Sequence, residues 1–162
     1  MLLRRLIPED APLMLEWMHD PAVVEKLQTN FGAKTMEDCL RFIDAARDAG
    51  ENLHLAVADN DGTYMGTVSL KHITGEQAEF AITVRAAAMG RGFARFAMDG
   101  ILGIGLEELG LKRIYWCVSP ENRRAVRFYD KNGYTRTDPE ALNITGYTPE
   151  QISAYIWYCV NK

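Results

Sequence analysis

Hydrophobic and polar residues alternate along several short segments of the chain, with the two-residue period of half-buried β-strands. Asn60, Asp61 and Gly62 lie between two of these segments and favour a tight turn, so the two segments are predicted to form a hairpin. Runs of β-branched and aromatic residues indicate further strands. In total, strands are predicted at residues 1–6, 53–58, 64–70, 77–84, 112–118 and 153–160, and there is room for one more strand near the C-terminus.

Other segments have the spacing of helices, in which apolar residues recur every three or four positions. Thr35 and Asp38 have the spacing of a capping box, and Gly50 is a suitable end for the helix that they start. Ser119 with the proline after it is a typical helix start. Residues 138–148 are predicted to form a long loop. Helices are predicted at residues 8–20, 23–28, 35–50, 93–109 and 119–133.

The order of these elements indicates the fold class. A chain of 162 residues has the length of one domain and can bury a full core without disulfides. One strand, a helical region and three antiparallel strands are followed by a helix, a strand, a helix and one or two final strands. This order fits an α/β (α+β) fold with a mixed, mostly antiparallel central sheet flanked by helices. We therefore expect a single domain over residues 1–162.

The composition argues against several classes of protein. The net charge is −4, which disfavours a general nucleic-acid-binding protein. No stretch of about 18 residues is apolar and free of charge, so neither a membrane span nor a signal peptide is expected. The three cysteines and three histidines lack metal-ligand spacing. We expect a cytoplasmic protein without a metal site, in which the cysteines are reduced.

The charges are unevenly distributed. Residues 85–131 contain nine Lys or Arg against five Asp or Glu, and the remainder contains nine against seventeen. The basic region suits an anionic cofactor, and the acidic remainder suits a cationic amine. The basic residues of 123–131 are equally consistent with a helix face that only contacts water.

Two glycines mark a candidate phosphate-binding turn inside this basic region. Gly90 and Gly92 follow the predicted strand 77–84 and precede the helix 93–109. Glycine lets the backbone approach a phosphate closely, and the free N–H groups at a helix N-terminus favour an anion. Since many short Gly-x-Gly pairs are ordinary turns, the pair needs support from its context.

That support comes from a family resemblance over residues 77–136. The segment MGRGFA, with Gly92 and Ala94, resembles the cofactor loop of the GNAT superfamily of N-acetyltransferases, although Met89 stands where Gln or Arg is usual. A second family pattern is similar to the later segment that contains Asn122, Ala125, Tyr129, Gly133 and Tyr134. The layout resembles the branch with ribosomal-protein N-terminal, spermidine and amino-sugar acetyltransferases.

The resemblance implies acetyl-coenzyme A (acetyl-CoA) as co-substrate. Backbone groups at the strand end, Ile82, Thr83 and Val84, would hold the thioester end, and Asn122 would contact the cofactor unless it only caps a helix. The pyrophosphate would lie over the loop residues Met89, Gly90, Arg91, Gly92, Phe93, Ala94 and Arg95.

Two residues are candidates for catalysis. Glu79 lies on the strand face opposite Phe80, beside small residues, and is a candidate general base for the amine; the alternative is an ion-paired or solvated glutamate. Tyr129 coincides with a family position where a phenol of pKa about 10 can donate to the departing thiolate. The alternative interpretation is that Tyr129 is a core aromatic residue.

We therefore expect an N-acetyltransferase that moves an acetyl group to a primary amine by direct attack in a ternary complex. The acceptor stays open between a peptide N-terminus, a polyamine and an amino sugar. One alternative is a catalytically silent acyl-CoA-binding regulatory module. A dinucleotide-binding domain is disfavoured, because the third glycine of its motif is missing and a hairpin precedes the loop. A homodimer that buries an edge strand is possible from the sequence.

Overall fold

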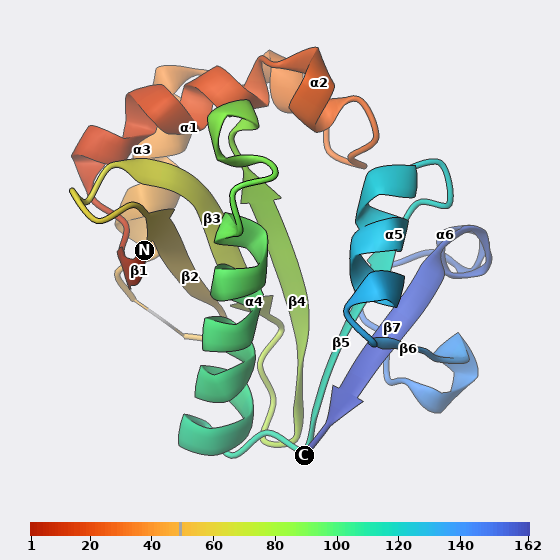
Figure 1. Cartoon of the computed structure of the whole chain (residues 1–162). Helices are drawn as coiled ribbons and strands as arrows, with labels where there is room; N and C mark the ends of the chain where they lie inside the picture. The colour runs from red at the N-terminus through yellow and green to blue at the C-terminus, as the bar shows by residue number, and fades with distance from the viewer. Residues whose placement is uncertain (49) are drawn as a thin grey trace.

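The computed structural model describes residues 1–48 and 50–162. Within these residues, seven strands form one sheet in the order β1-β2-β3-β4-β5-β7-β6 (Figure 1). Adjacent strands in it are antiparallel, except for the parallel pair β4 and β5. The expected mixed, mostly antiparallel sheet is confirmed. Its strands are β1 (Leu2–Arg5), β2 (Leu53–Ala58), β3 (Tyr64–Lys71), β4 (Gln77–Val84), β5 (Arg113–Val118), β6 (Thr135–Arg136) and β7 (Ile156–Asn161).

Helices cover both faces of this sheet. On one face, the apolar side chains of β4 and β5, such as Phe80 and Trp116, form a core with α4 and α5. On the other face, α1 and α3 pack over β2 and β3 (Figure 1), and residues 142–157 pack over β5 and β7. The helices are α1 (Ala11–Met18), α2 (Pro21–Val24), α3 (Met36–Ala45), α4 (Phe93–Gly103), α5 (Arg123–Lys131) and α6 (Pro149–Ala154).

Several predicted helix boundaries are wrong. α3 starts at the predicted capping box but ends at Ala45, well before Gly50. The predicted helix 23–28 is instead the single turn α2, which starts earlier because Asp20 accepts a hydrogen bond from the Ala22 N–H group at 2.9 Å. The helix predicted from Ser119 begins only at Arg123.

The glycines of the long central helix have a structural reason. A Cβ atom at Gly100 would lie 2.7 Å from Leu3 Cδ1, and one at Gly105 would lie 2.5 Å from Ile114 Cδ1. Glycine at these two positions therefore lets the helix lie close to β1 and β5. The regular α-helix ends at Gly103, and a π-helical turn, Ile104–Glu108, continues it.

The feature that creates the site is the separation of β4 from β5. The two strands pair only from Gln77 to Glu79 on β4 and from Arg113 to Tyr115 on β5. Beyond these residues the strands diverge, with α4 in front of β4 and α5 in front of β5 (Figure 1). Backbone groups of residues 80–84 on the β5 side of β4 are consequently available to a ligand. No helix within the described residues is long and apolar enough to cross a bilayer.

Candidate active site

A cavity of about 770 Å³ occupies the space between the diverging strands. It is lined by residues from both faces of the sheet. On the face of the sheet that carries Phe80, the lining residues come from α4 and α5. On the opposite face, they are Glu79, Lys71 and residues of segment 23–31. The cavity can therefore receive one ligand from each side and bring the two together at the point where β4 and β5 part.

The α4 side of the cavity contains the expected phosphate-binding turn. Gly90 and Gly92 have φ angles of +72° and +85°, in the left-handed region that favours glycine. Gly92 is the N-cap residue of α4. No hydrogen bond connects the backbone N–H groups of residues 92–95 to another backbone or side-chain group of the described residues. These groups can bind an anion, as the first N–H groups of a helix do.

Basic side chains of α5 lie next to this turn. Arg124, Arg127 and Lys131 line the cavity, and none of them forms a salt bridge with a carboxylate of the described residues. Arg124 Nη1 contacts Met89 Sδ, so a guanidinium lies beside the position where the family usually has Gln or Arg. The basic residues of α5 thus have the location that a phosphate-bearing cofactor requires.

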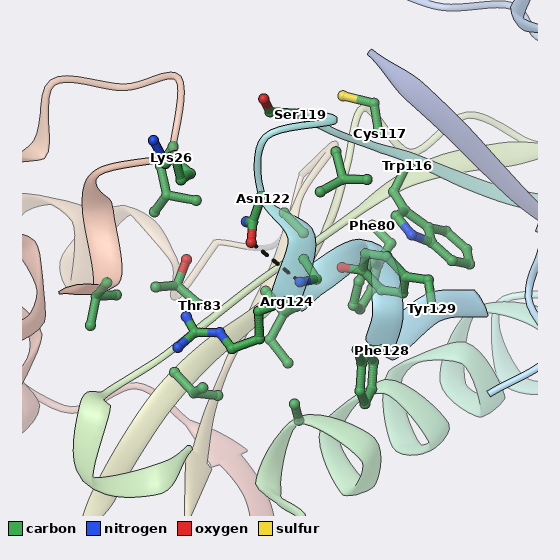
Figure 2. A pocket seen from close by; sticks show the side chains of 18 of the residues that line it. Lys26, Phe80, Thr83, Trp116, Cys117, Ser119, Asn122, Arg124, Phe128 and Tyr129 are labelled. Carbon is green, nitrogen blue, oxygen red and sulfur yellow. Dashed lines mark hydrogen bonds between the residues drawn. The ribbon is translucent and has the colours of Figure 1, made fainter. Parts of the chain in front are cut away.

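Asn122 has the capping role, and its place in the cavity wall is compatible with the second role that the sequence left open. Its side-chain Oδ1 accepts a hydrogen bond from the Ala125 N–H group at 3.2 Å and caps α5 (Figure 2). Asn122 also lines the cavity. Because the cap uses only the carbonyl oxygen, the side-chain NH₂ group is left to donate to a ligand.

Tyr129 lies on α5, between the core and the cavity. Its ring packs among aromatic residues, with ring centroids 5.4 Å from Trp116 and 5.1 Å from Tyr158. The hydroxyl points toward the side of the cavity where Asn122 and Arg124 lie (Figure 2) and makes no hydrogen bond to a described residue. Burial raises the pKa of Tyr129 well above its ordinary value. The phenol is therefore neutral at physiological pH and can donate a hydrogen bond.

Glu79 lies on the opposite face, as its alternation with Phe80 predicted. It is 3% exposed, and its Oε1 atom accepts a hydrogen bond from the Tyr147 hydroxyl. Lys71 Nζ lies 3.5 Å from Oε1, and His72 Nε2 lies 3.7 Å from Oε2. One carboxylate oxygen is thus held by protein groups, whereas the other is not hydrogen-bonded.

Two buried side-chain atoms lack hydrogen-bond partners within the described residues, namely Glu79 Oε2 and Trp116 Nε1. Both residues line the same cavity. Buried polar atoms are nearly always hydrogen-bonded, so these two atoms are exceptions, and each keeps an unused hydrogen-bonding capacity in a residue that lines the cavity.

The structure brings most of the predicted site residues together around this cavity. Arg91 and Phe93 are outside the lining: Phe93 is buried in the core, and the Arg91 guanidinium lies over its ring. Only their backbone groups remain available for the predicted role. The predicted residues that line the cavity are Glu79, Ile82, Thr83, Val84, Met89, Gly90, Gly92, Ala94, Arg95, Asn122 and Tyr129.

Sequence reasoning missed the residues on the Glu79 side. Lys26, Gln28, Lys71, Cys117 and Tyr147 all line the cavity there. Lys71 lies directly opposite Glu79 in the antiparallel pairing of β3 and β4, one residue beyond the predicted strand 64–70, so the register of these two strands could have identified it. Cys117 lies on β5, a strand that was predicted, whereas Lys26, Gln28 and Tyr147 come from turns and loops whose position the sequence pattern does not specify.

Comparisons with known proteins agree with this geometry. Residues 1–135 match the acetyltransferase (GNAT) domain family. Acetyltransferase PseH from Campylobacter jejuni is 23% identical over 133 residues, which are 82% of this chain and 81% of PseH. A spermidine N-acetyltransferase from Vibrio cholerae, solved with CoA and spermine, has a TM-score of 0.79 at 19% identity, covering 99% of this chain and 94% of that one.

A further solved structure, a GNAT-family acetyltransferase from Bacillus anthracis, has a TM-score of 0.75 at 22% identity and covers 99% of this chain and 93% of its own. At these identities the solved structures show the common fold. The separated strands, the open helix N-terminus and the unpaired basic side chains fit acetyl-CoA, the co-substrate of this family. The family match and the fold together place the chain among the GNAT acetyltransferases.

Proposed function

We propose that the protein transfers an acetyl group from acetyl-CoA directly to a primary amine while both substrates are bound. The observation that carries this proposal is the meeting of two unlike groups in one cavity. Glu79, with an unpaired carboxylate oxygen, approaches from one face of the sheet, and Tyr129, with an unpaired hydroxyl, approaches from the other.

Glu79 has the role of proton acceptor in this proposal. Bound acetyl-CoA supplies an acetyl thioester, whose carbonyl carbon is the point of attack for the amine. An amine of pKa about 10 is mostly protonated at neutral pH and must lose a proton to become a nucleophile. Glu79 Oε2 takes that proton, directly or through water, while the Tyr147 hydroxyl holds Oε1 and thereby orients the carboxylate.

Tyr129 and the backbone of β4 act on the other side of the reacting carbon. Backbone groups of Ile82, Thr83 and Val84 position the thioester, because the β5 side of β4 has no partner strand there among the described residues. When the new C–N bond forms and the C–S bond breaks, the Tyr129 hydroxyl donates a hydrogen bond to the sulfur. Asn122 and Arg124 bind the cofactor on the same side.

A cysteine in the cavity raises the alternative of an acetyl-enzyme intermediate. Cys117 lines the cavity, but burial raises the pKa of its thiol. The thiolate, which is the nucleophilic form, is therefore disfavoured. This supports direct transfer, and Cys117→Ala is expected to retain turnover.

The test is the rate of thiol release from acetyl-CoA with a panel of amines, for the wild-type protein and for Glu79→Gln. We expect turnover with at least one amine and a fall in kcat of about 100-fold for the variant, the usual contribution of a general base. The glutamine side chain of this variant keeps an oxygen for the Tyr147 hydroxyl, so the fold should be retained. If Glu79→Gln has the same kcat as the wild-type protein at every pH from 6 to 9, Glu79 is excluded as the base. Saturable CoA binding without turnover of any amine would favour the silent binding module.

A further inference from the structure

The cavity has a distinct acceptor side, which we define as the lining residues of segment 23–31 together with Lys71, Glu79 and Tyr147. The lining residues of that segment are Val23, Lys26, Leu27, Gln28, Thr29 and Phe31. Lys71 and Glu79 are cross-strand neighbours, so their side chains lie on the same face of the sheet. Phe80 points to the other face, toward α4. The amine acceptor therefore meets a different set of charges from the cofactor.

The charges of the acceptor side are not those that a polycation would need. Lys26 and Lys71 are positive, and among all described residues that line the cavity Glu79 is the only carboxylate. Glu79 Oε1 is already occupied by Tyr147, with Lys71 Nζ at 3.5 Å. Oε2 accepts no hydrogen bond from a described residue, although His72 Nε2 lies 3.7 Å from it, and it can therefore receive one amino group. Additional ammonium groups on the same acceptor would face two lysines, and like charges at close range oppose binding.

Lys26 is available to an anion. It follows α2 and lies on the opposite side of the cavity from Tyr129 (Figure 2). Its nearest carboxylates are Glu25 at 3.5 Å and Glu121 at 3.8 Å, and both of these side chains are well exposed. Such exposed ion pairs contribute little free energy, so Lys26 can exchange them for a ligand. Gln28, which also lines the cavity, adds a further hydrogen-bond donor.

We propose that the acceptor is a small primary amine that carries an anionic group, a phosphate or a carboxylate. Its amino group lies at Glu79, and its anionic group pairs with Lys26. This inference rests on the proposed acetyl transfer and specifies its substrate class. It differs from the cationic acceptor that the charge distribution along the chain suits, because the acidic excess lies outside the cavity lining.

The test compares amines in matched pairs that differ by one anionic group. The pairs are O-phosphoethanolamine with ethanolamine, glucosamine 6-phosphate with glucosamine, and β-alanine with β-alaninamide, with spermidine as the polycation. The first two pairs test a phosphate and the third a carboxylate. In at least one pair, kcat/KM from thiol release should be about tenfold higher for the anionic member, as one partly desolvated ion pair allows. This preference should decrease as salt is added.

Charge reversal identifies the residue that reads the anion. Lys26→Glu should abolish the preference for the anionic member and leave the KM for acetyl-CoA unchanged. Lys162→Glu, at an exposed position outside the cavity, changes the net charge equally and should keep the preference. The proposal would be overturned if kcat/KM for the neutral amines or for spermidine equals or exceeds kcat/KM for the anionic amines. The proposal would also be overturned if Lys26→Glu changes only the KM for acetyl-CoA.

A binding measurement separates this inference from the proposed function. Calorimetry on the complex with CoA measures the affinity for O-phosphoethanolamine, glucosamine 6-phosphate and β-alanine against their neutral partners, without chemistry. If no amine is turned over, the proposed function fails, and the calorimetric comparison still decides the anion site. Tighter binding of an anionic member that Lys26→Glu removes supports the site; equal binding within every pair refutes it.

Discussion

Tyr129→Phe should reduce catalysis without weakening the fold. The hydroxyl makes no hydrogen bond to a described residue, so its removal breaks no contact within that part of the protein. The ring keeps its packing against Trp116 and Tyr158, whose centroids lie within 6 Å. Removing a buried, unpaired hydroxyl is neutral or slightly stabilising, and we expect the free energy of unfolding to change by less than about 1 kcal/mol.

The expected loss of rate follows from the charge on the leaving group. A hydrogen bond to a charged partner contributes about 1.5–3 kcal/mol, which corresponds to roughly 10- to 150-fold in kcat. Because burial raises the pKa of Tyr129, the phenol is a weaker acid than a thiol of pKa about 8.5. It should therefore stabilise the departing thiolate by a hydrogen bond and keep its own proton. The acceptor KM should change little.

The assay combines thiol release with thermal unfolding on the same preparations. The reasoning holds if kcat falls at least tenfold while the unfolding midpoint moves by no more than a few degrees. A kcat within twofold of the wild type would refute the role in the leaving-group step. A large fall in the unfolding midpoint would instead identify Tyr129 as a core aromatic residue, the alternative that the sequence left open.

Three further outcomes are expected. Arg124→Ala should raise the KM for acetyl-CoA about tenfold through loss of a charged contact. Arg123 does not line the cavity, so Arg123→Ala should change this KM little. Tyr147→Phe leaves Glu79 Oε1 without its hydroxyl donor and should cost roughly 1–3 kcal/mol in urea unfolding, together with a lower kcat. Burial raises the pKa of Tyr64, so its proton stays bound in the folded state above pH ~10, where unfolded tyrosines lose theirs. Stability should thus be full below pH ~10 and fall above it, which urea titrations from pH 8 to 11 would measure; a flat profile would contradict this.

The regular strands and the local structure of the candidate cofactor segments were predictable from sequence because each depends on contiguous residues. In β4, alternation assigned Phe80 and Glu79 to opposite faces correctly, since a buried face requires a strict period. The phosphate-binding turn and α5 each lie within one short segment. Short helices were less predictable, because single caps determine them. The capping box of Thr148 and Gln151 starts α6, where only a loop and a strand had been predicted.

The acceptor side could not be assembled from sequence for a different physical reason. It combines Lys26 from a turn after α2, Lys71 from β3 and Tyr147 from a loop far along the chain. Lys71 is placed beside Glu79 by the strand register, but Lys26 and Tyr147 join them only through the tertiary packing of loops that carry no periodic pattern. For the same reason, a charge count over the whole chain does not give the local charge around Glu79.

The early end of pairing between β4 and β5 has an evolutionary consequence. In the proposed function, cofactor recognition along residues 80–84 uses the main chain, which is the same whatever side chains these positions carry. Substitutions at the positions that share a face with Glu79, such as Ala81 and Thr83, can therefore reshape the amine pocket without removing the groups that hold the cofactor. Such a scaffold can acquire new acceptors by mutation while it keeps one acetyl donor.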